Sequence, residues 1–336
     1  MANLYDIAKV AGVSKSTVSR VINDQPGVKE DKRLKIQETI KKLNYKPNAL
    51  ARSLVLQKTH TIGIIVRELS NNFYSEYIRN LHHIADSMGY GALYCNRTSY
   101  EESNIDYLEF LNKKVDGFIF LGEGTVTKEE LESLVLSKYP LVVIQSMLDV
   151  QDVTYININN YRAYYEAVEY LIKLGHRKII NISGPLDKEF VERNKGYSEA
   201  VTMHNLDYEI TYYLDYFMES AYELALKIAP SIRNEKITAA VCSNNILATG
   251  FIDGLIDSGI KVPEEFSVIG FDDIVAAEVT HNNIPAITSV KQPQKDISEY
   301  AVGKLMQMME QGIGEYSKDF SCKLKIRNST SGNKFI

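Results

Sequence analysis

Two short helical patterns near the beginning of the chain constrain its fold more than any other feature of its 336 residues. In residues 4–11, apolar side chains recur at the spacing of an amphipathic helix, and Gly12 breaks this pattern. Ser14 then stands where a helix N-cap is favoured, and a second helical pattern runs over residues 15–23. Two helices joined by a tight turn that contains glycine can form a helix-turn-helix, whose second helix enters the major groove of DNA.

The second helical pattern has one apolar side and one polar side. The apolar side consists of Val18, Val21 and Ile22, and the polar side of Lys15, Ser16, Ser19 and Arg20. The polar side offers hydrogen-bond donors and a guanidinium with almost no apolar bulk, which suits contact with DNA. An ordinary helical hairpin with a solvated polar face would show the same spacing.

The distribution of charge favours the DNA-binding interpretation. The whole chain carries 38 Lys and Arg against 43 Asp and Glu, a net charge of −5. Residues 1–60 carry 12 Lys and Arg against 5 Asp and Glu, which leaves 26 against 38 in residues 61–336. This distribution, with a basic first segment and an acidic remainder, is expected when only the first segment contacts the phosphates of DNA.

Length and composition exclude several classes of protein. A chain of 336 residues is too long for one core, so two or three domains are expected. The sequence shows no run of 18 apolar residues and no secretory signal, so we expect a cytoplasmic protein that does not span a membrane. Cys95, Cys242 and Cys322 lie far apart, which favours three buried thiols over a metal or redox site. No metal and no cofactor are expected.

A third helix and a weak fourth one follow the helix-turn-helix pattern. The third is predicted over residues 31–43 and completes a small three-helix core, and Pro47 disfavours its continuation. Residues 48–56 begin with Asn48 in an N-cap position, but a helix of this length is unstable alone in water. We expect it to order only against a packing partner.

From Thr61 onward, short apolar runs alternate with helical stretches. The runs cover residues 61–66, 91–95, 117–121, 141–145, 178–183, 211–216, 238–243 and 266–272, and the first helical stretches lie near 74–88, 101–113 and 128–138. This order predicts parallel sheets with helices on both faces. Eight or nine strands exceed one comfortable sheet, so two lobes with a cleft at the carboxyl ends of their strands fit better. The polar residues after 327 are expected to fray.

Several motifs together resemble the LacI/GalR family of bacterial transcriptional regulators. They are LYDIAKVAGVSKSTVSRVIN (4–23), LNYKPNALARSL (43–54) and VPEEFSVIGFDD (262–273), with GHRKI and RNKGY between the last two. The resemblance covers roughly residues 3–327. It implies an all-α helix-turn-helix headpiece, a hinge helix, and an α/β core of two lobes like those of periplasmic binding proteins, each with a doubly wound parallel sheet.

The resemblance also implies domain boundaries, with three crossings between the lobes near residues 160, 290 and 320. We expect a headpiece over 1–46, a hinge helix and linker over 47–60, an effector-binding core over 61–327, and a polar tail over 328–336. Within the core, lobe one takes about 61–160 and 291–320, and lobe two about 161–290 and 321–327.

By the same resemblance, the DNA-binding residues fall into three groups. Lys15, Ser16 and Arg20 occupy base-reading positions, and an arginine can pair in bidentate fashion with guanine. Thr17, Ser19 and Asn23 are expected to contact phosphates, which position the headpiece. Asn48, Arg52 and Leu54 belong to the hinge segment, where Leu54 matches a leucine that wedges into the minor groove. A core leucine of a short helix is the alternative interpretation of Leu54.

The resemblance places candidate ligand residues on loops that follow strands of both lobes. They are Phe73, Tyr74, Arg193, Tyr216, Asn245 and Asp272. An arginine and an aspartate beside aromatic rings suit a sugar, but they would also hold a nucleobase. Asp272 would serve equally as a turn cap, and Tyr216 as a core residue.

The chain departs from the family pattern in several of these loops. Arg67-Glu68 replaces the more usual Pro-Asp, Asn72 stands where proline is common, and Asn159 and Asn245 stand where relatives often carry Asp. Losing carboxylates removes strong acceptors for hydroxyl groups, so the identity of a sugar does not carry over.

The function that these observations predict is a dimeric repressor of a carbohydrate-use operon, with double-stranded DNA and a small effector as partners. A pair of headpieces requires a near-palindromic operator. One alternative is a regulator that uses a non-sugar corepressor or a phosphoprotein coregulator, although residues 274–283 lack an arginine of the sort that catabolite-control relatives offer such a protein. A soluble small-molecule binding protein is a more distant alternative, and no nucleophile elbow, P-loop or zinc-protease motif favours an enzyme.

Overall fold

The chain divides into two compact units, Met1–His60 and Thr61–Ile336. The computed structural model describes residues 3–22, 25–45, 58–97, 114–146, 148–185, 188–274, 284–312, 314 and 316–333. The expected helices over residues 48–56 and 101–113 lie outside these described residues.

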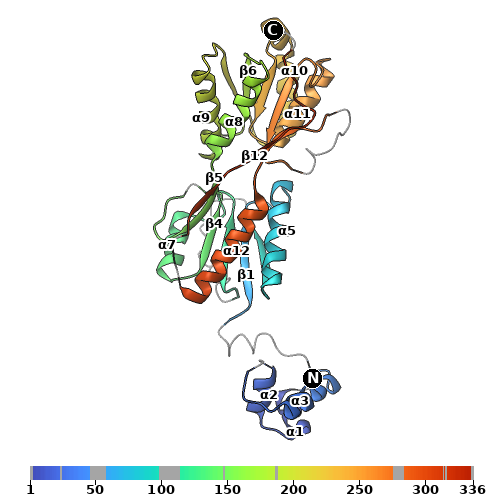
Figure 1. Cartoon of the computed structure of the whole chain (residues 1–336), viewed down its shortest axis with the longest axis vertical. Helices are drawn as coiled ribbons and strands as arrows, with labels where there is room; N and C mark the ends of the chain where they lie inside the picture. Colours follow the sequence, from blue (N-terminus) through green and yellow to red (C-terminus); the bar gives the residue numbers. More distant parts are fainter. Residues whose placement is uncertain are drawn as a thin grey trace. The chain divides into compact units, whose positions relative to one another are not determined.

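The described residues of the first unit form three helices, α1 (Leu4–Ala11), α2 (Lys15–Ile22) and α3 (Glu30–Lys42) (Figure 1). Asn3 caps α1 through its side chain, and the helix ends at Gly12, whose φ of 70° is a left-handed conformation that glycine adopts without strain. Ser14 Oγ accepts a hydrogen bond from the backbone N–H of Thr17 at 3.2 Å, as expected of an N-cap. The predicted helix-turn-helix is confirmed.

Apolar side chains from all three helices form the small core of the first unit. Its buried members are Ile7, Ala8, Ala11, Val18, Val21 and Ile36. Each comes from the apolar side of its helix, so the amphipathic spacing of the sequence accounts for the packing.

In the part of the second unit that the structure describes, the strands form two six-stranded sheets, one in each lobe (Figure 1). The sheet of lobe one has the order β11 (Lys318–Phe320), β5 (Thr154–Ile158), β4 (Leu141–Ile144), β3 (Gly117–Leu121), β1 (Thr61–Val66) and β2 (Gly91–Asn96). The sheet of lobe two has the order β12 (Lys323–Lys325), β10 (Thr288–Lys291), β9 (Ser267–Phe271), β8 (Ala239–Cys242), β6 (Ile179–Ser183) and β7 (Glu209–Tyr213). Neighbouring strands are parallel except for the antiparallel pair of β10 and β12. The fold class agrees with the prediction.

Helices pack on these sheets. In lobe one they are α5 (Asn72–Ser87), α7 (Lys128–Leu136) and α12 (Gln294–Gln311), and in lobe two α8 (Asn160–Lys173), α9 (Lys188–Met203), α10 (Met218–Glu235) and α11 (Asn245–Asp257). Strand β1 shows why two layers form, because Ile64 packs with the cluster that includes α5 and α12 while Ile65 packs with α7. Alternate residues of a strand point to opposite faces, so a strand that is apolar throughout needs cover on both.

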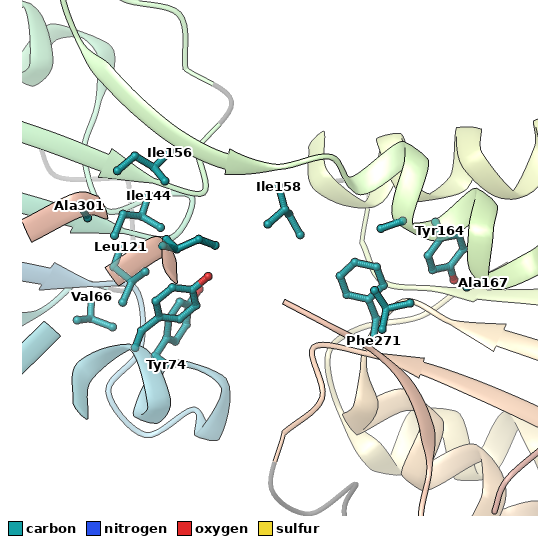
Figure 2. Close-up of a cluster of buried hydrophobic side chains, with 14 of the residues drawn as sticks. Val66, Tyr74, Leu121, Ile144, Ile156, Ile158, Tyr164, Ala167, Phe271 and Ala301 are labelled. Carbon is teal, nitrogen blue, oxygen red and sulfur yellow. The ribbon is translucent and has the colours of Figure 1, made fainter. Parts of the chain in front are cut away.

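Among the described elements, the chain passes between the two sheets three times. It leaves β5 of lobe one for α8 of lobe two, returns from β10 to α12, and crosses again from β11 to β12. Ile158, at the end of β5, lies between the buried residues of the two lobes (Figure 2). The lobes therefore meet at the carboxyl ends of their strands, where ligands bind in open α/β sheets.

Two expectations about the chain's elements are wrong. The strand expected over residues 211–216 covers Glu209–Tyr213 instead. The tail was expected to fray, yet Ser329 is fully buried: its hydroxyl donates to the carbonyl of Val268 at 2.6 Å and accepts from the N–H of Thr288 at 2.8 Å. Further on, the N–H of Asn333 donates to the carbonyl of Leu174 at 2.9 Å. These bonds hold residues 328–333 against lobe two despite their polar composition.

Candidate functional site

The polar side of α2 is exposed, as the sequence predicts. Lys15, Ser16 and Arg20 are exposed, whereas Val18 on the opposite side is fully buried. Thr17 and Ser19 are half-buried. The hydroxyl of Ser14 lies 2.8 Å from those of Ser16 and Thr17, which fixes the polar groups at the start of the helix. The other expected DNA-binding residues, Asn23, Asn48, Arg52 and Leu54, lie outside the described residues.

A cavity of about 280 Å³ lies between the lobes. All six candidate ligand residues line it: Phe73 and Tyr74 from α5, Arg193 from α9, Tyr216 from the loop after β7, Asn245 from the start of α11, and Asp272 directly after β9. Its other lining residues are Arg67, Glu68, Asn71, Gln145, Glu189, Phe190, Phe217, Asn244, Ile246 and Ile274. The six candidate side chains, which are up to 199 positions apart in the sequence, thus meet at one place.

Arg193 is held rigidly in the wall of this cavity. Its Nε donates to Asn160 Oδ1 at 2.8 Å and its Nη1 donates to the carbonyl of Ser243 at 2.5 Å. The guanidinium also stacks over the ring of Phe271, 3.9 Å from the ring centroid, and only 3% of the residue is exposed. Planar stacking and several directed donors suit arginine better than lysine at this position.

Two carboxylates share the remaining side of that guanidinium. Asp272 Oδ1 and Glu189 Oε2 each lie 3.9 Å from Arg193 Nη2. Burial raises the pKa of Asp272 to about 6; the charge of Glu189 adds to the increase, and Arg193 and a hydrogen bond from Gln292 oppose it. Asp272 adopts a φ of 86°, in the left-handed region, which non-glycine residues occupy at a cost and mainly at functional sites.

A hydrogen-bond network connects the two lobes behind the cavity. Gln292 Nε2 donates to Asp272 Oδ1 at 2.8 Å, and Gln292 Oε1 accepts from the side-chain amide of Gln145. The same oxygen accepts from the hydroxyl of Tyr77, a fully buried residue, at 3.3 Å. Because Gln145 follows β4 of lobe one and Asp272 follows β9 of lobe two, a ligand that disturbs this network acts on the contact between the lobes.

Aromatic rings form two walls of the cavity. The rings of Phe73 and Tyr74 meet edge to face with centroids 5.0 Å apart, and burial raises the pKa of Tyr74 well above its usual range. On the other wall, the rings of Tyr216 and Phe190 lie 5.6 Å apart. Tyr216 is half-buried and lines the cavity, so the alternative that it is a core residue does not hold. The Arg67 guanidinium of lobe one lies 5.5 Å from the Tyr216 ring centroid.

Asn245 is oriented by its neighbours. Its Oδ1 accepts from the N–H of Asp273 at 2.9 Å and from Ser289 Oγ at 2.8 Å. Its Nδ2 is buried without a hydrogen-bond partner among the described residues. The neighbouring Asn244 caps α11 by accepting from the N–H of Leu247.

Sequence reasoning missed Gln145, Gln292 and Glu189. Gln145 directly follows β4, which the sequence predicts, so its position at the carboxyl end of that strand was a usable signal. Gln292 directly follows β10, a strand that the sequence analysis does not predict. Glu189 lies in the first turn of α9, one turn before Arg193, and nothing in its local sequence distinguishes it from a solvated carboxylate.

No metal centre and no membrane span are found in the part of the chain that the structure describes. Its His, Cys, Asp and Glu side chains form no group of three or more that could hold a metal ion. None of its helices is long and apolar enough to cross a membrane.

Comparison with known proteins identifies the family. Residues 3–48 match the family described as bacterial regulatory proteins of the lacI family, and residues 168–330 match the periplasmic binding protein-like domain. Catabolite control protein A of Priestia megaterium is 36% identical over 333 residues, 97% of this chain and 98% of that protein. The chain belongs to the LacI family, and it is a DNA-binding transcriptional regulator.

Solved structures agree with the observed fold. The Lac repressor dimer bound to operator and the anti-inducer ONPF superposes with a TM-score of 0.84 at 24% identity, covering 98% of this chain and 99% of that one. The complex of the transcriptional regulator CelR with cellobiose superposes with a TM-score of 0.70 at 25% identity, covering 98% of this chain and all of that one.

Proposed function

We propose that this regulator is a repressor of a carbohydrate-use operon and that a sugar in the cavity between the lobes controls it. The observation that carries the proposal is the convergence of Arg193 and Asp272 with the rings of Phe73 and Tyr216 around that cavity. A sugar offers hydroxyl groups for charged side chains and a C–H face for an aromatic ring. The structural relative CelR, whose complex contains cellobiose, supports this choice of ligand.

The side chains act by binding and by linking the lobes. Hydroxyl groups of the sugar bind Asp272 and Arg193 of lobe two, while Phe73 and Tyr74 of lobe one cover its other side. A sugar that contacts both lobes changes the angle between them. The hydrogen bonds among Gln145, Gln292 and Asp272, which connect the lobes, rearrange when this angle changes. A coupling of about 1–3 kcal/mol between sugar and DNA is typical of such a device.

DNA binding requires two copies of the chain. Lys15, Ser16 and Arg20 read bases, Thr17 and Ser19 position α2 on phosphates, and two headpieces together read a near-palindromic operator. Asn23, Asn48, Arg52 and Leu54 complete the DNA contact, the last three from a hinge segment within residues 47–60. A sugar that releases the operator, an inducer, fits this arrangement, and a protein acting on bacterial DNA works in the cytoplasm.

Two other functions fit less well. The family resemblance leaves a phosphoprotein coregulator as one alternative, but the described cavity is equipped for a small molecule. An enzyme would need a reactive group poised for chemistry. The Arg193 guanidinium and the Asp272 carboxylate instead hold each other and their neighbours in place.

Selection of DNA from a random duplex library by the full chain tests the DNA-binding half of the proposal. We expect enrichment of a near-palindromic sequence. Enrichment that depends on Arg20, and that an added sugar abolishes, supports the complete proposal. A library that shows no enriched sequence at low salt overturns it.

A further inference from the structure

The charged groups around the cavity are unevenly balanced. Among the lining residues that the structure describes, three carboxylates, Glu68, Glu189 and Asp272, face two guanidiniums, Arg67 and Arg193. A cleft with low-dielectric walls strengthens the effect of such an imbalance on a charged ligand. The excess of negative charge therefore disfavours binding of an anionic ligand in the cavity.

Two of the three nitrogens of the buried Arg193 guanidinium already donate hydrogen bonds, and the third lies near two carboxylates. The Arg193 Nε and Nη1 groups donate to Asn160 and to the carbonyl of Ser243, and Nη2 lies between the carboxylates of Glu189 and Asp272. Its face is covered by the ring of Phe271. The side chains of Glu189 and Asp272 are 25% and 14% exposed, against 3% for Arg193, so a phosphate group entering the cavity meets the carboxylates before the guanidinium.

Glu189 also occupies the place that an anion would take at the start of α9. The first turn of a helix attracts negative charge, and Glu189 supplies it in the first turn of this 16-residue helix. Its side chain is 25% exposed, and it lines the cavity, so its charge faces an entering ligand. The Arg67 guanidinium of lobe one lies 5.5 Å from the ring centroid of Tyr216 of lobe two.

We propose that the cavity accepts a hydroxyl-rich ligand without a phosphate group and that Glu189, beside Asp272, is the residue that rejects the phosphate ester. This inference rests on the proposed function of the cavity as a sugar site. Specificity of this kind comes from a repulsive element as much as from attractive contacts. Hydroxyl groups can donate to both carboxylates, whereas a phosphate dianion cannot.

Inorganic phosphate tests the selectivity without knowledge of the ligand. Melting temperatures of the full chain are compared in phosphate and in sodium chloride of equal ionic strength at pH 7.5, for the wild type, Glu189→Gln and Glu192→Gln. Glu192 lies on the same helix and pairs with Lys195 at 2.6 Å outside the cavity, so its variant is the matched control. Phosphate bound at the headpiece affects all three proteins alike.

We expect the melting temperature of Glu189→Gln to be higher in phosphate than in chloride, because a ligand that binds the folded state stabilises it. The change in melting temperature from chloride to phosphate should be the same for the wild type and Glu192→Gln. Equal stabilisation of the wild type, or no gain in Glu189→Gln, overturns the proposal.

Matched pairs of sugars separate this inference from the proposed function. Glucose and ribose are compared with glucose 6-phosphate and ribose 5-phosphate by calorimetry. We expect the wild type to bind a phosphate ester at least about ten-fold more weakly than the corresponding sugar. This ratio of dissociation constants should become smaller in Glu189→Gln but not in Glu192→Gln. An ester that binds more tightly than its parent contradicts the inference. If neither sugar nor ester binds, but phosphate raises the melting temperature of Glu189→Gln alone, the rejection of phosphate by Glu189 is supported and the proposal of a sugar effector is contradicted.

Discussion

Arg20 is the exposed guanidinium on the polar side of α2, and replacing it tests whether that side reads bases. Arg20→Ala is expected to weaken binding to the selected operator by about 1–3 kcal/mol, because a bidentate contact with guanine is lost. Binding to random DNA should change much less, since that binding depends on overall charge. Fluorescence anisotropy on both duplexes measures the difference.

The control for this substitution is Lys32→Ala, which removes one exposed positive charge from α3 of the same unit. It should weaken binding to both duplexes by a similar factor. An equal loss on both duplexes for Arg20→Ala as well would show that Arg20 contributes charge alone.

Asp272 predicts a pH dependence of stability. Burial, with the charge of Glu189, raises the pKa of Asp272 to about 6, against roughly 4 for an aspartate in the unfolded chain. The folded state therefore binds the proton more tightly, so the ionised carboxylate lowers the stability of the fold above pH 6, and this loss is recovered as pH falls toward 4.

Asp272→Asn removes the ionisation while keeping an oxygen that can accept from Gln292. Its melting temperature should exceed that of the wild type at pH 7.5, by the equivalent of about 1–2 kcal/mol, and the difference should vanish near pH 4.5. Thermal unfolding followed by circular dichroism at both pH values measures it. A difference that stays constant with pH would mean that the Asp272 carboxylate does not titrate in this range.

At the scale of the element, the polar segment after β12 shows how hydrogen bonds from a side chain to buried backbone groups outweigh composition. Ser329→Ala removes the hydroxyl that accepts from the N–H of Thr288 and donates to the carbonyl of Val268. The buried N–H of Thr288 loses its partner, so the substitution should cost about 1–3 kcal/mol of folding free energy.

Urea unfolding of both proteins measures the effect of Ser329→Ala. Ser133→Ala, at an exposed position of α7, is the control and should leave stability nearly unchanged. Identical midpoints for the two variants would contradict the packing of residues 328–333 against lobe two.

The elements that could be predicted from the sequence are those with a strong local pattern. Gly12 and Ser14 defined the turn between α1 and α2, and the uninterrupted apolar run of β1 predicted a strand covered on both faces. By contrast, β5 alternates buried and half-buried residues in TYINI, and the three-residue strands β11 and β12 are mostly charged. Such strands form because the crossing chain lies beside a sheet edge, which no local pattern shows.

The candidate site was predictable to a similar extent. The resemblance to the family placed Arg193, Asp272 and the aromatic residues, and the structure brings all six candidates to one cavity. The roles of Gln292 and Glu189 depend on which side chains face them across the lobes. That information exists only in the folded chain.

At the scale of the whole molecule, the charge split between the two units predicts a steep salt dependence. Each phosphate neutralised by a Lys or Arg of the basic first unit releases counterions from DNA. The affinity for the operator should fall by about 10³-fold or more between 50 and 200 mM salt if six or more phosphates are contacted. Anisotropy titrations over this range measure the slope, and a flat profile would contradict binding through the basic unit.

The coupling between the cavity and the DNA is the central claim, and one measurement tests it most directly. The dissociation constant of the full chain for its selected operator is determined with and without a saturating sugar that raises the chain's melting temperature. The account predicts a change of about 5–150-fold in this dissociation constant, which a substitution at Asp272 reduces. An operator affinity that stays the same when the cavity is filled would contradict it.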